Sequence, residues 1–588
     1  MLRARALLCL LAALSTAAAC AKPKPDCCAI EPQLHPDTQL HALAEFVLDG
    51  YFERYPLRGV ALGKHELDGR IRDCSGPALQ AELVVLRDDL AKLRSLDADA
   101  LTPVGRVERA ALISTLDAEL FELEVRRAPW TNPMFYMADL ELTAYIARDY
   151  APLRERAKAV TDAAKAGVGH LAHAQGNLEA ALARPFVDTA LLQVRGTISF
   201  IEADVSAAFA GLEDPVEKRM LTDALAELTT ALRGYETFLL ERQATATDEF
   251  ALGPERYVEM LARTQGIELD LPTLKRIAEA DLAQNLAQVE ALAKQIDSEK
   301  SPAEVMAMIA ADKPTPERVL AVATEQAATA RQFLIDHDIV TIPTQDVAVV
   351  TETPAFMRWN IAFLDGAGPF EKSALPSFYY ISPPDPTWPL EQQQAYVPGT
   401  TDLLFITVHE VWPGHFLHGL HVKINRSWIL KSLWNFTTGE GWAHYTEQLM
   451  ADAGLRPRTS WTGDDPRIEL GQLQNALLRD VRFVVALGLH TEGMTVDTAT
   501  ELFRTKAFQD PVSARQQAVR GTFDPMYLGY TLGKLIVLQL REDWLAQRRA
   551  AGSDDSLKTF HDALLSYGAA PLPAIREAMV GREGALID

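Results

Sequence analysis

Hydrophobic positions recur every three or four residues through most of residues 38–340. This spacing gives an α-helix one buried face. It is clearest in Leu79–Leu86, in the alanine-rich run Glu155–Leu182 and in Ala278–Ile296, and alanine and leucine also favour the helix intrinsically. The prolines that punctuate these runs include Pro152, Pro185 and Pro272. We therefore predict a helical N-terminal part over residues 37–337.

The pattern changes between residues 338 and 398. The β-branched runs Ile339–Ile342 and Val347–Val350 predict short strands. A loop rich in proline and aromatic residues follows at Pro376–Pro384. Helical spacing resumes after Thr400–Asp402, a good N-cap cluster, and continues to the end of the chain. Residues 338–588 are thus expected to hold a small strand-and-loop insert and further helices, in one continuous unit with the preceding part. The predicted fold class is mostly α.

The N-terminus has the pattern of an export signal. Positive residues at Arg3 and Arg5 precede an apolar run from Ala6 to Leu14, and small residues follow up to Cys20. This is typical of a signal peptide over residues 1–20 and is too short for a membrane span. The ending also resembles a bacterial lipoprotein signal, in which Cys20 would carry the lipid, although Ala17 stands where such signals usually have leucine. We expect a periplasmic or cell-surface protein, with residues 21–36 as a tether.

The cysteine positions argue against thiol catalysis, and the net charge argues against nucleic-acid binding. All five cysteines lie in the first 74 residues of the 588, so the body of the protein contains no thiol for catalysis. Cys74 could pair with Cys27 or Cys28 in an oxidising compartment. The net charge of −23 argues against a nucleic-acid partner, because phosphate binding requires clustered positive charge.

The motif His409-Glu410-Val411-Trp412-Pro413-Gly414-His415 nearly matches the zinc-protease pattern H-E-x-x-H. Its second histidine comes six positions after the first, which in a regular helix means a rotation of about 240° and a rise of about 9 Å. Pro413 would also clash with the carbonyl of His409, and Gly414 tolerates unusual backbone angles. The helix must therefore bulge or break here. The motif is either a deformed metal site or a helix end with two incidental histidines.

A third metal ligand is available downstream. Glu440, His444 and Glu447 have the spacing i, i+4 and i+7, so they share one face of a predicted helix. Glu440 follows His415 by a gap suited to a helix–loop–helix that returns to the first motif. Two histidines and one glutamate, with a fourth position open for water, form a catalytic zinc set.

Together, H-E-x-x-P-G-H at residues 409–415 and E-G-W-A-x-Y-x-E at residues 440–447 resemble the motifs of the bacterial domain-of-unknown-function 885 family. That family is often exported and is considered related to gluzincin zinc metallopeptidases. The second motif is also similar to the N-E-G-F-A segment of aminopeptidase N-like enzymes, whose glutamate binds zinc. The resemblance implies a large helical metallopeptidase-like fold with a cleft, and one Zn²⁺ per chain held by His409, His415 and Glu440.

The same resemblance implies roles outside the metal shell. Glu447 is expected beside the metal ligands and not among them. His444 stands where the family usually has an apolar residue, and His418 where it commonly has glutamine. Both histidines are expected near the site as supporting or incidental groups.

The chemistry of such a site assigns further roles. Glu410, next to a ligand, would take a proton from the attacking water. The oxyanion needs a donor besides the metal, and we consider Tyr530 and His490, which lie in segments that resemble family motifs. Arg479 or Arg482 could hold a substrate carboxylate.

Tyr380, in the strand-and-loop insert, could line the cleft. Tyrosine is also common in rigid structural loops, so a purely structural role stays open.

Three functions remain open. The first is an exported zinc metallopeptidase that hydrolyses short peptides, as a carboxypeptidase or oligopeptidase. The second is a helical di-metal oxidoreductase, because His444 and Glu447 stand three apart, although bundle sites of that kind use the order E-x-x-H. The third is a non-catalytic surface lipoprotein that binds a peptide.

Overall fold

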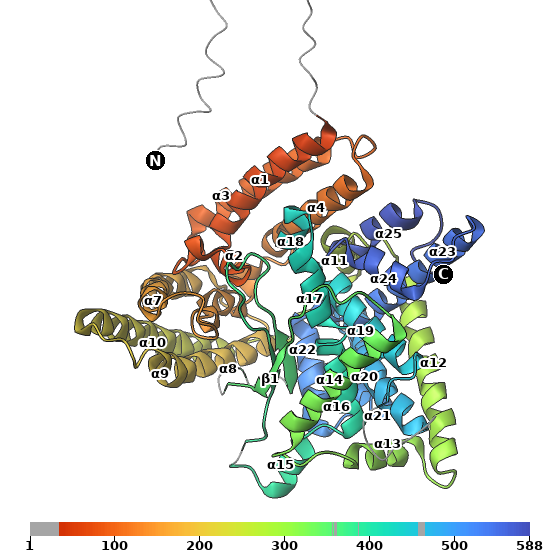
Figure 1. The fold of residues 1–588 in the computed structure, drawn as a ribbon. Helices are drawn as coiled ribbons and strands as arrows, with labels where there is room; N and C mark the ends of the chain where they lie inside the picture. The colour runs from red at the N-terminus through yellow and green to blue at the C-terminus, as the bar shows by residue number, and fades with distance from the viewer. Residues whose placement is uncertain (1–34, 355–356, 358–360, 386, 457–464, 588) are drawn as a thin grey trace, which may run out of the picture.

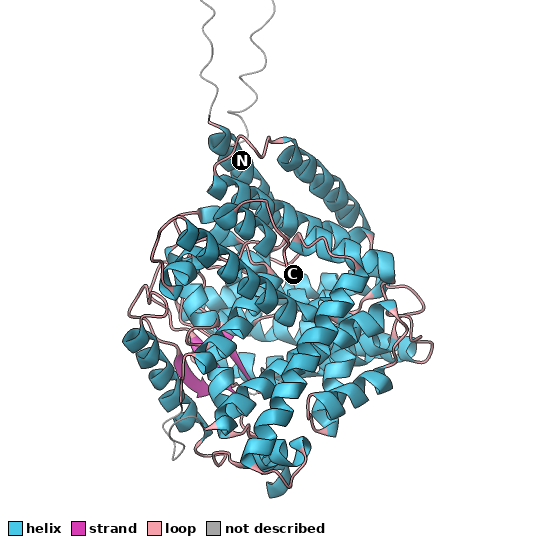
Figure 2. Ribbon diagram, turned by 90° about the vertical axis from the view of Figure 1, so that its right-hand side faces the viewer, coloured by secondary structure: helices cyan, strands magenta, loops and turns pink. Residues whose placement is uncertain are grey.

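The computed structural model describes residues 35–354, 357, 361–385, 387–456 and 465–587. Within them, helices dominate and surround one small sheet, so the predicted mostly α fold is confirmed (Figures 1 and 2). The expected signal peptide, Cys20 and nearly all of the tether lie outside the described residues. Cys27 and Cys28 do too, and Cys74 is a free, buried thiol among the described residues.

Helices fill the N-terminal part, as the periodicity predicts. Their bounds are α1 (Pro36–Arg54), α2 (Pro56–Ala61), α3 (Gly76–Ser95), α4 (Pro103–Glu124), α5 (Ala128–Thr131), α6 (Met134–Met137), α7 (Leu153–Asn177), α8 (Arg184–Phe200), α9 (Ser206–Ala208), α10 (Pro215–Gln243), α11 (Pro254–Gln265), α12 (Leu271–Ile296), α13 (Pro302–Ala311) and α14 (Val319–His337). Several begin at a side-chain cap followed by proline in the first turn, as with Ser75 before α3 and Asp270 before α12. Such a cap satisfies a backbone N–H that has no partner inside the helix.

The sheet has three strands in the order β1-β3-β2. β3 (Phe378–Ile381) lies in the centre, parallel to β1 (Val349–Glu352) and antiparallel to β2 (Ala362–Asp365). Its position corrects the sequence analysis, which assigned residues 378–381 to a loop. The aromatic residues there form a largely buried strand, with Tyr379 fully buried. The second predicted run, residues 347–350, overlaps β1.

The strand predicted at residues 339–342 is wrong, because side chains bind the backbone there in place of a neighbouring strand. The Ile339 carbonyl accepts from His561 Nδ1, at 2.7 Å. The Thr341 N–H donates to Asp562, at 2.9 Å, and the Thr341 carbonyl accepts from His421, at 2.8 Å. The β-branched run is therefore an extended segment clamped between helices.

The C-terminal part is again helical. Its helices are α15 (Leu390–Tyr396), α16 (Thr400–Glu410), α17 (His415–Ile424), α18 (Trp428–Ser432), α19 (Phe436–Asp452), α20 (Pro466–Thr491), α21 (Val496–Lys506), α22 (Pro511–Phe523), α23 (Gly529–Ala550), α24 (Leu557–Leu565) and α25 (Leu572–Val580). Helix α16 packs against α14, α19 and α20, and α19 packs along α23. These contacts, with those of α17 and α23 to α19, bring α16, α17, α19, α20 and α23 together.

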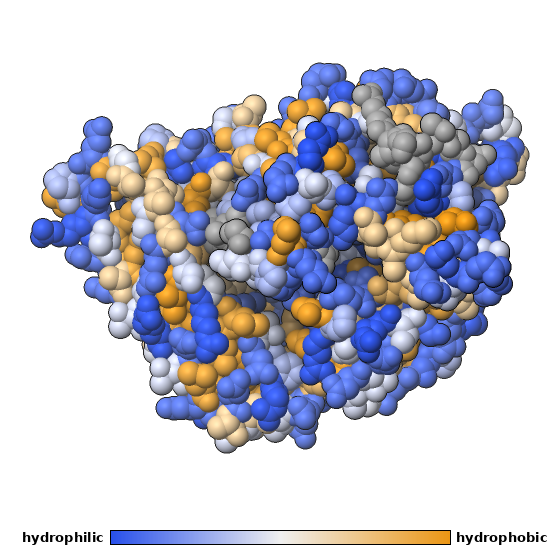
Figure 3. Space-filling model, turned by 90° about the horizontal axis from the view of Figure 1, so that it is seen from below, coloured by the Kyte–Doolittle hydropathy of each residue, from blue (hydrophilic) through white to orange (hydrophobic). Residues whose placement is uncertain are grey.

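One connected set of buried apolar side chains runs from Leu40 to Ile575, so the two parts share a core. The face seen in Figure 3 is mostly hydrophilic, with apolar side chains in small scattered groups. Among the described residues, no helix has the length and apolar character that crossing a membrane requires.

Candidate metal centre

The motif His409–His415 is a junction between two helices. Helix α16 ends at Glu410 and α17 begins at His415, with a cis Trp412–Pro413 peptide between them. The predicted break in the helix is therefore confirmed. Gly414 lies so close to α16 that its N–H donates to the Val408 carbonyl at 3.0 Å, and a Cβ at residue 414 would lie 1.7 Å from the His409 carbonyl oxygen. The break brings the ring centres of His409 and His415 to 4.8 Å.

Glu440, in the second turn of α19, completes a three-residue cluster. Its Oε2 lies 3.4 Å from the Nε2 of His409 and 3.4 Å from the Nε2 of His415. One candidate ligand atom from each side chain lies within 4.8 Å of the other two. A tetrahedral zinc site with ligands at about 2.0–2.1 Å has ligand–ligand edges of roughly 3.3–3.4 Å. The two contacts to Glu440 match that edge.

The protein leaves the Glu440 Oε2 atom without a hydrogen bond although it is buried. Burial raises the pKa of the Glu440 carboxyl, but the charges of His415 and His409 outweigh burial and hold this pKa well below its usual range. For His409, burial and Arg479 lower the pKa, while the contact with Glu440 and the hydrogen bond with Glu447 raise it to about 9. The cluster thus concentrates anionic oxygen and imidazole nitrogen, which is a donor set that suits zinc.

Glu447 orients His409 through its Nδ1 atom, whereas the Nε2 atom of His409 faces Glu440. It lies two turns after Glu440 on α19, is fully buried, and accepts from His409 Nδ1 at 2.7 Å. Arg479 of α20 holds the same carboxylate at 3.0 Å and is itself anchored on the Asn475 carbonyl at 2.9 Å. A carboxylate on the far nitrogen of a histidine fixes the tautomer that leaves Nε2 free for a metal. Arg479 is therefore occupied by a protein carboxylate.

The two additional histidines lie beside the cluster and face buried surroundings. His444 Nδ1 is 3.4 Å from Glu447 Oε2, and the His418 ring lies 5.1 Å from the ring of Trp434. Burial lowers the pKa of each histidine to about 3. Both are therefore neutral at ordinary pH.

Two glycines bring Tyr530 to the cluster. Helices α19 and α23 cross where Gly441 faces Gly533, and a Cβ on either residue would lie within 2.7 Å of the other's backbone. Tyr530, one turn before Gly533, thereby stacks over His409 with ring centres 6.3 Å apart. Burial and the charge of Glu440 raise the pKa of Tyr530, so its hydroxyl stays protonated as a donor.

Glu410 lies beside the cluster at the C-terminal end of α16. One of its carboxylate oxygens accepts from the Leu364 N–H of β2 at 2.9 Å. Since β2 is an edge strand of the sheet, this bond fixes the carboxylate from the sheet side. The sequence could not predict the contact, because Leu364 and Glu410 are far apart along the chain.

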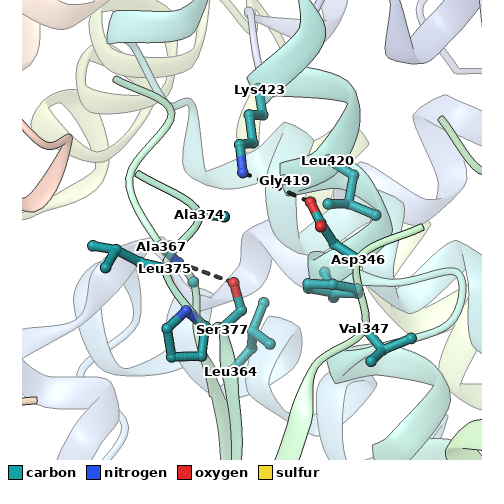
Figure 4. A pocket seen from close by; sticks show the side chains of 13 residues that line it. Asp346, Val347, Leu364, Ala367, Ala374, Leu375, Ser377, Gly419, Leu420 and Lys423 are labelled. Carbon is teal, nitrogen blue, oxygen red and sulfur yellow. Dashed lines mark hydrogen bonds and ion pairs between the residues drawn. The ribbon is translucent and has the colours of Figure 1, made fainter. Parts of the chain in front are cut away.

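A hollow of about 300 Å³ lies next to this support (Figure 4). Leu364 lines it from β2, and Lys423 pairs with Asp346 across it at 3.7 Å. The α17 residues that line it (Phe416, Gly419, Leu420 and Lys423) share one face of that helix. His415 does not line the hollow, so the hollow does not contain the cluster.

Two candidates from the sequence lie elsewhere. His490 donates through Nε2 to the Gly521 carbonyl, packs on Tyr257 and Phe250, and has its pKa lowered to about 4 by burial. The Tyr380 ring packs between Phe363 and Phe378 in the sheet. None of these neighbours belongs to the metal cluster.

Arg482 and Arg520 place guanidinium groups over the Tyr530 ring, with Cζ at 4.8 Å and 6.0 Å from its centre. Arg482 was a candidate from the sequence, whereas Arg520 was missed. No motif marks Arg520, and only the packing of α22 near α20 reveals it.

A family model and two solved structures match most of this chain. A model of the bacterial protein family of unknown function DUF885 matches residues 56–579. A candidate lipoprotein of unknown function from Shewanella oneidensis has a similar structure, with a TM-score of 0.76 and 21% identity over 92% of this chain and 99% of that one. A candidate lipoprotein from Colwellia psychrerythraea has a TM-score of 0.73 and 16% identity over 92% and 98% of the two chains. No curated protein matches the sequence.

Proposed function

Since this chain belongs to the bacterial family DUF885, whose function is unknown, we propose from its own side chains that it is a zinc-dependent peptidase of short peptides. The observation that carries the proposal is the pair of 3.4 Å contacts from Glu440 Oε2 to the Nε2 atoms of His409 and His415. These three side chains could hold a zinc ion, and a catalytic zinc site has three protein ligands of this kind and one further position for water or substrate.

The residues around the cluster fit hydrolysis. When bound, zinc would supply an acidified water and polarise the carbonyl of the scissile bond. Glu410, held by the Leu364 N–H, would accept a proton from the attacking water and deliver it to the leaving amine. Tyr530, kept protonated, donates to the developing oxyanion. Glu447 and Arg479 keep His409 in the orientation that this geometry needs.

The di-metal alternative finds less support. Among the described residues, the two three-residue groups that could hold a metal are His409, His415, Glu440 and Cys74, Asp139, His170. They share no residue, whereas dinuclear bundle sites use bridging carboxylates close to both ions.

Location outside the cytoplasm is part of the proposal. The two similar structures belong to candidate lipoproteins, and Cys20 follows a signal-like segment in this chain. We propose an exported protein anchored by a lipid on Cys20. Labelling cells with a radioactive fatty acid would show label on the wild type and none on a Cys20→Ala variant.

Cleavage of a mixed peptide library, analysed by mass spectrometry, tests the activity. The proposal predicts cleavage by zinc-loaded protein, and its loss on chelation and in Glu410→Gln. Glu501→Gln, an exposed glutamate in an ion pair on α21, is the matched control and should cleave normally. Absence of cleavage with zinc fully bound would contradict the proposal and favour a non-catalytic peptide-binding lipoprotein.

A further inference from the structure

Arg482 is a buried cation without a carboxylate partner. It lies on α20, is 7% exposed, and its Nε donates to the side-chain oxygen of Gln517 at 2.9 Å. It forms no ion pair with any residue in the described part of the chain. The two other arginines around Tyr530 differ, because Arg479 binds Glu447 at 3.0 Å and Arg520 binds Asp524 at 2.8 Å. Arg482 is the exception among the three.

The surroundings of Arg482 favour one more negative charge. A buried guanidinium without an anion is costly, because desolvation is not compensated by an ion pair. Burial and the nearby charges of Arg520 and Arg479 lower the pKa of Arg482 to about 10. The Tyr530 ring, 4.8 Å from its Cζ, offsets only part of this cost.

The position of Arg482 relates it to the metal cluster through Tyr530. The Tyr530 ring lies 6.3 Å from the ring of His409 and 4.8 Å from Arg482 Cζ. One peptide residue spans about 3.8 Å from Cα to Cα. Arg482 Cζ therefore lies at most about 11 Å from the centre of the His409 ring. A peptide contacts each group at roughly 3 Å, so it needs one or two residues to reach from the cluster to Arg482.

We propose that Arg482 binds the C-terminal carboxylate of the peptide, so that the protein is a carboxypeptidase that cuts one or two residues from a free C-terminus. This inference rests on the proposed peptidase function. A guanidinium can hold a carboxylate through two parallel hydrogen bonds, which fixes the peptide relative to the cluster. Arg479 is excluded from this role because Glu447 already occupies it.

Two peptides that differ only in a C-terminal carboxylate or carboxamide test the proposal. Binding to the zinc-loaded Glu410→Gln variant is measured by calorimetry, and cleavage by the wild type is followed by mass spectrometry. The carboxylate peptide should bind roughly 10- to 100-fold more tightly, the range for a hydrogen bond to a charged group. The products should be one- or two-residue fragments from the C-terminus.

The variant Arg482→Met removes the charge and keeps an unbranched apolar stem over Tyr530. It should abolish the preference for the carboxylate peptide while binding of the carboxamide peptide stays unchanged. Arg504→Met, which removes an exposed guanidinium paired with Glu501, is the control and should keep the preference. If Arg482→Met does not fold, the affinities of the two peptides for the Glu410→Gln variant, in which Arg482 is intact, decide whether the protein binds the C-terminal carboxylate.

The outcomes separate this inference from the proposed function. Cleavage of both peptides at equal rates, or cleavage at internal bonds, would overturn the carboxylate role of Arg482 and leave the peptidase intact. A preference that persists in Arg482→Met would do the same. If the zinc-loaded protein cleaves no peptide, both the carboxylate role of Arg482 and the proposed peptidase function are overturned.

Discussion

Replacing Gly414 by alanine tests whether the helix junction makes the metal site. The added Cβ would lie 1.7 Å from the His409 carbonyl oxygen, 2.3 Å from its carbonyl carbon and 2.5 Å from the Val408 oxygen. All three are backbone atoms of α16, so no side-chain rotation can relieve the contacts. Either α16 must move away from residue 414, or His415 must move away from His409.

The required displacement sets the size of the effect. Real Cβ atoms stay at least 3.0 Å from such atoms, so the backbone must move by more than roughly 1 Å. Mutations of residues that merely orient a ligand cost about 10- to 100-fold in metal affinity, and moving a ligand itself should cost at least as much. A misplacement of about 1 Å also reduces catalysis on the order of 100-fold. Overpacking of this kind destabilises by about 1–3 kcal/mol.

Zinc affinity is measured by competition with a chromophoric chelator, and stability by urea unfolding of the metal-free protein. Gly419→Ala is the control, because it lies on α17, a Cβ there meets nothing within 4 Å, and alanine favours the helix by about 0.5–1 kcal/mol. We expect loss of zinc affinity in Gly414→Ala and wild-type affinity in Gly419→Ala. Wild-type zinc affinity in Gly414→Ala would refute the reasoning.

Three further predictions follow from single contacts. Glu447→Gln should lower zinc affinity by about 10- to 100-fold in a chelator competition, because His409 loses its charged partner; an unchanged affinity would contradict that role. Gly533→Ala should separate α23 from α19, lowering the free energy of unfolding by about 1–3 kcal/mol in urea and slowing peptide cleavage, whereas a stable and fully active variant would contradict the close crossing. His490→Gln should leave cleavage unchanged at pH 7, and a large loss would restore His490 as a catalytic candidate. Because the pKa of His490 is lowered to about 4, the folded state binds fewer protons than the unfolded state between about pH 6.5 and 4, so its contribution to stability falls as the pH drops through that range. Between pH 7 and pH 5, the free energy of unfolding in urea should therefore fall by about 2 kcal/mol less in the variant than in the wild type.

Local sequence patterns predicted the helical parts and the break at Pro413-Gly414 well, because both depend on neighbouring residues. The spacing of Glu440 and Glu447 also predicted that both face the cluster from one helix, as they do. Predictions of this kind depend only on the geometry of a single helix.

The features that local patterns missed depend on distant partners. The run 339–342 has strand-like composition, yet His561, Asp562 and His421 take its backbone hydrogen bonds. Tertiary contacts overrode local propensity there. Likewise, Arg479 and Arg482 look alike in the sequence, and only Glu447 distinguishes the occupied guanidinium from the one without a carboxylate.

The number of zinc ions bound per chain, measured by native mass spectrometry, tests the central claim most directly. The account predicts one zinc ion in the wild type and in Glu410→Gln, because Glu410 lies beside the cluster, and none in Glu440→Gln, which loses the charged ligand. One tightly bound zinc ion in Glu440→Gln, or none in the wild type, would contradict it.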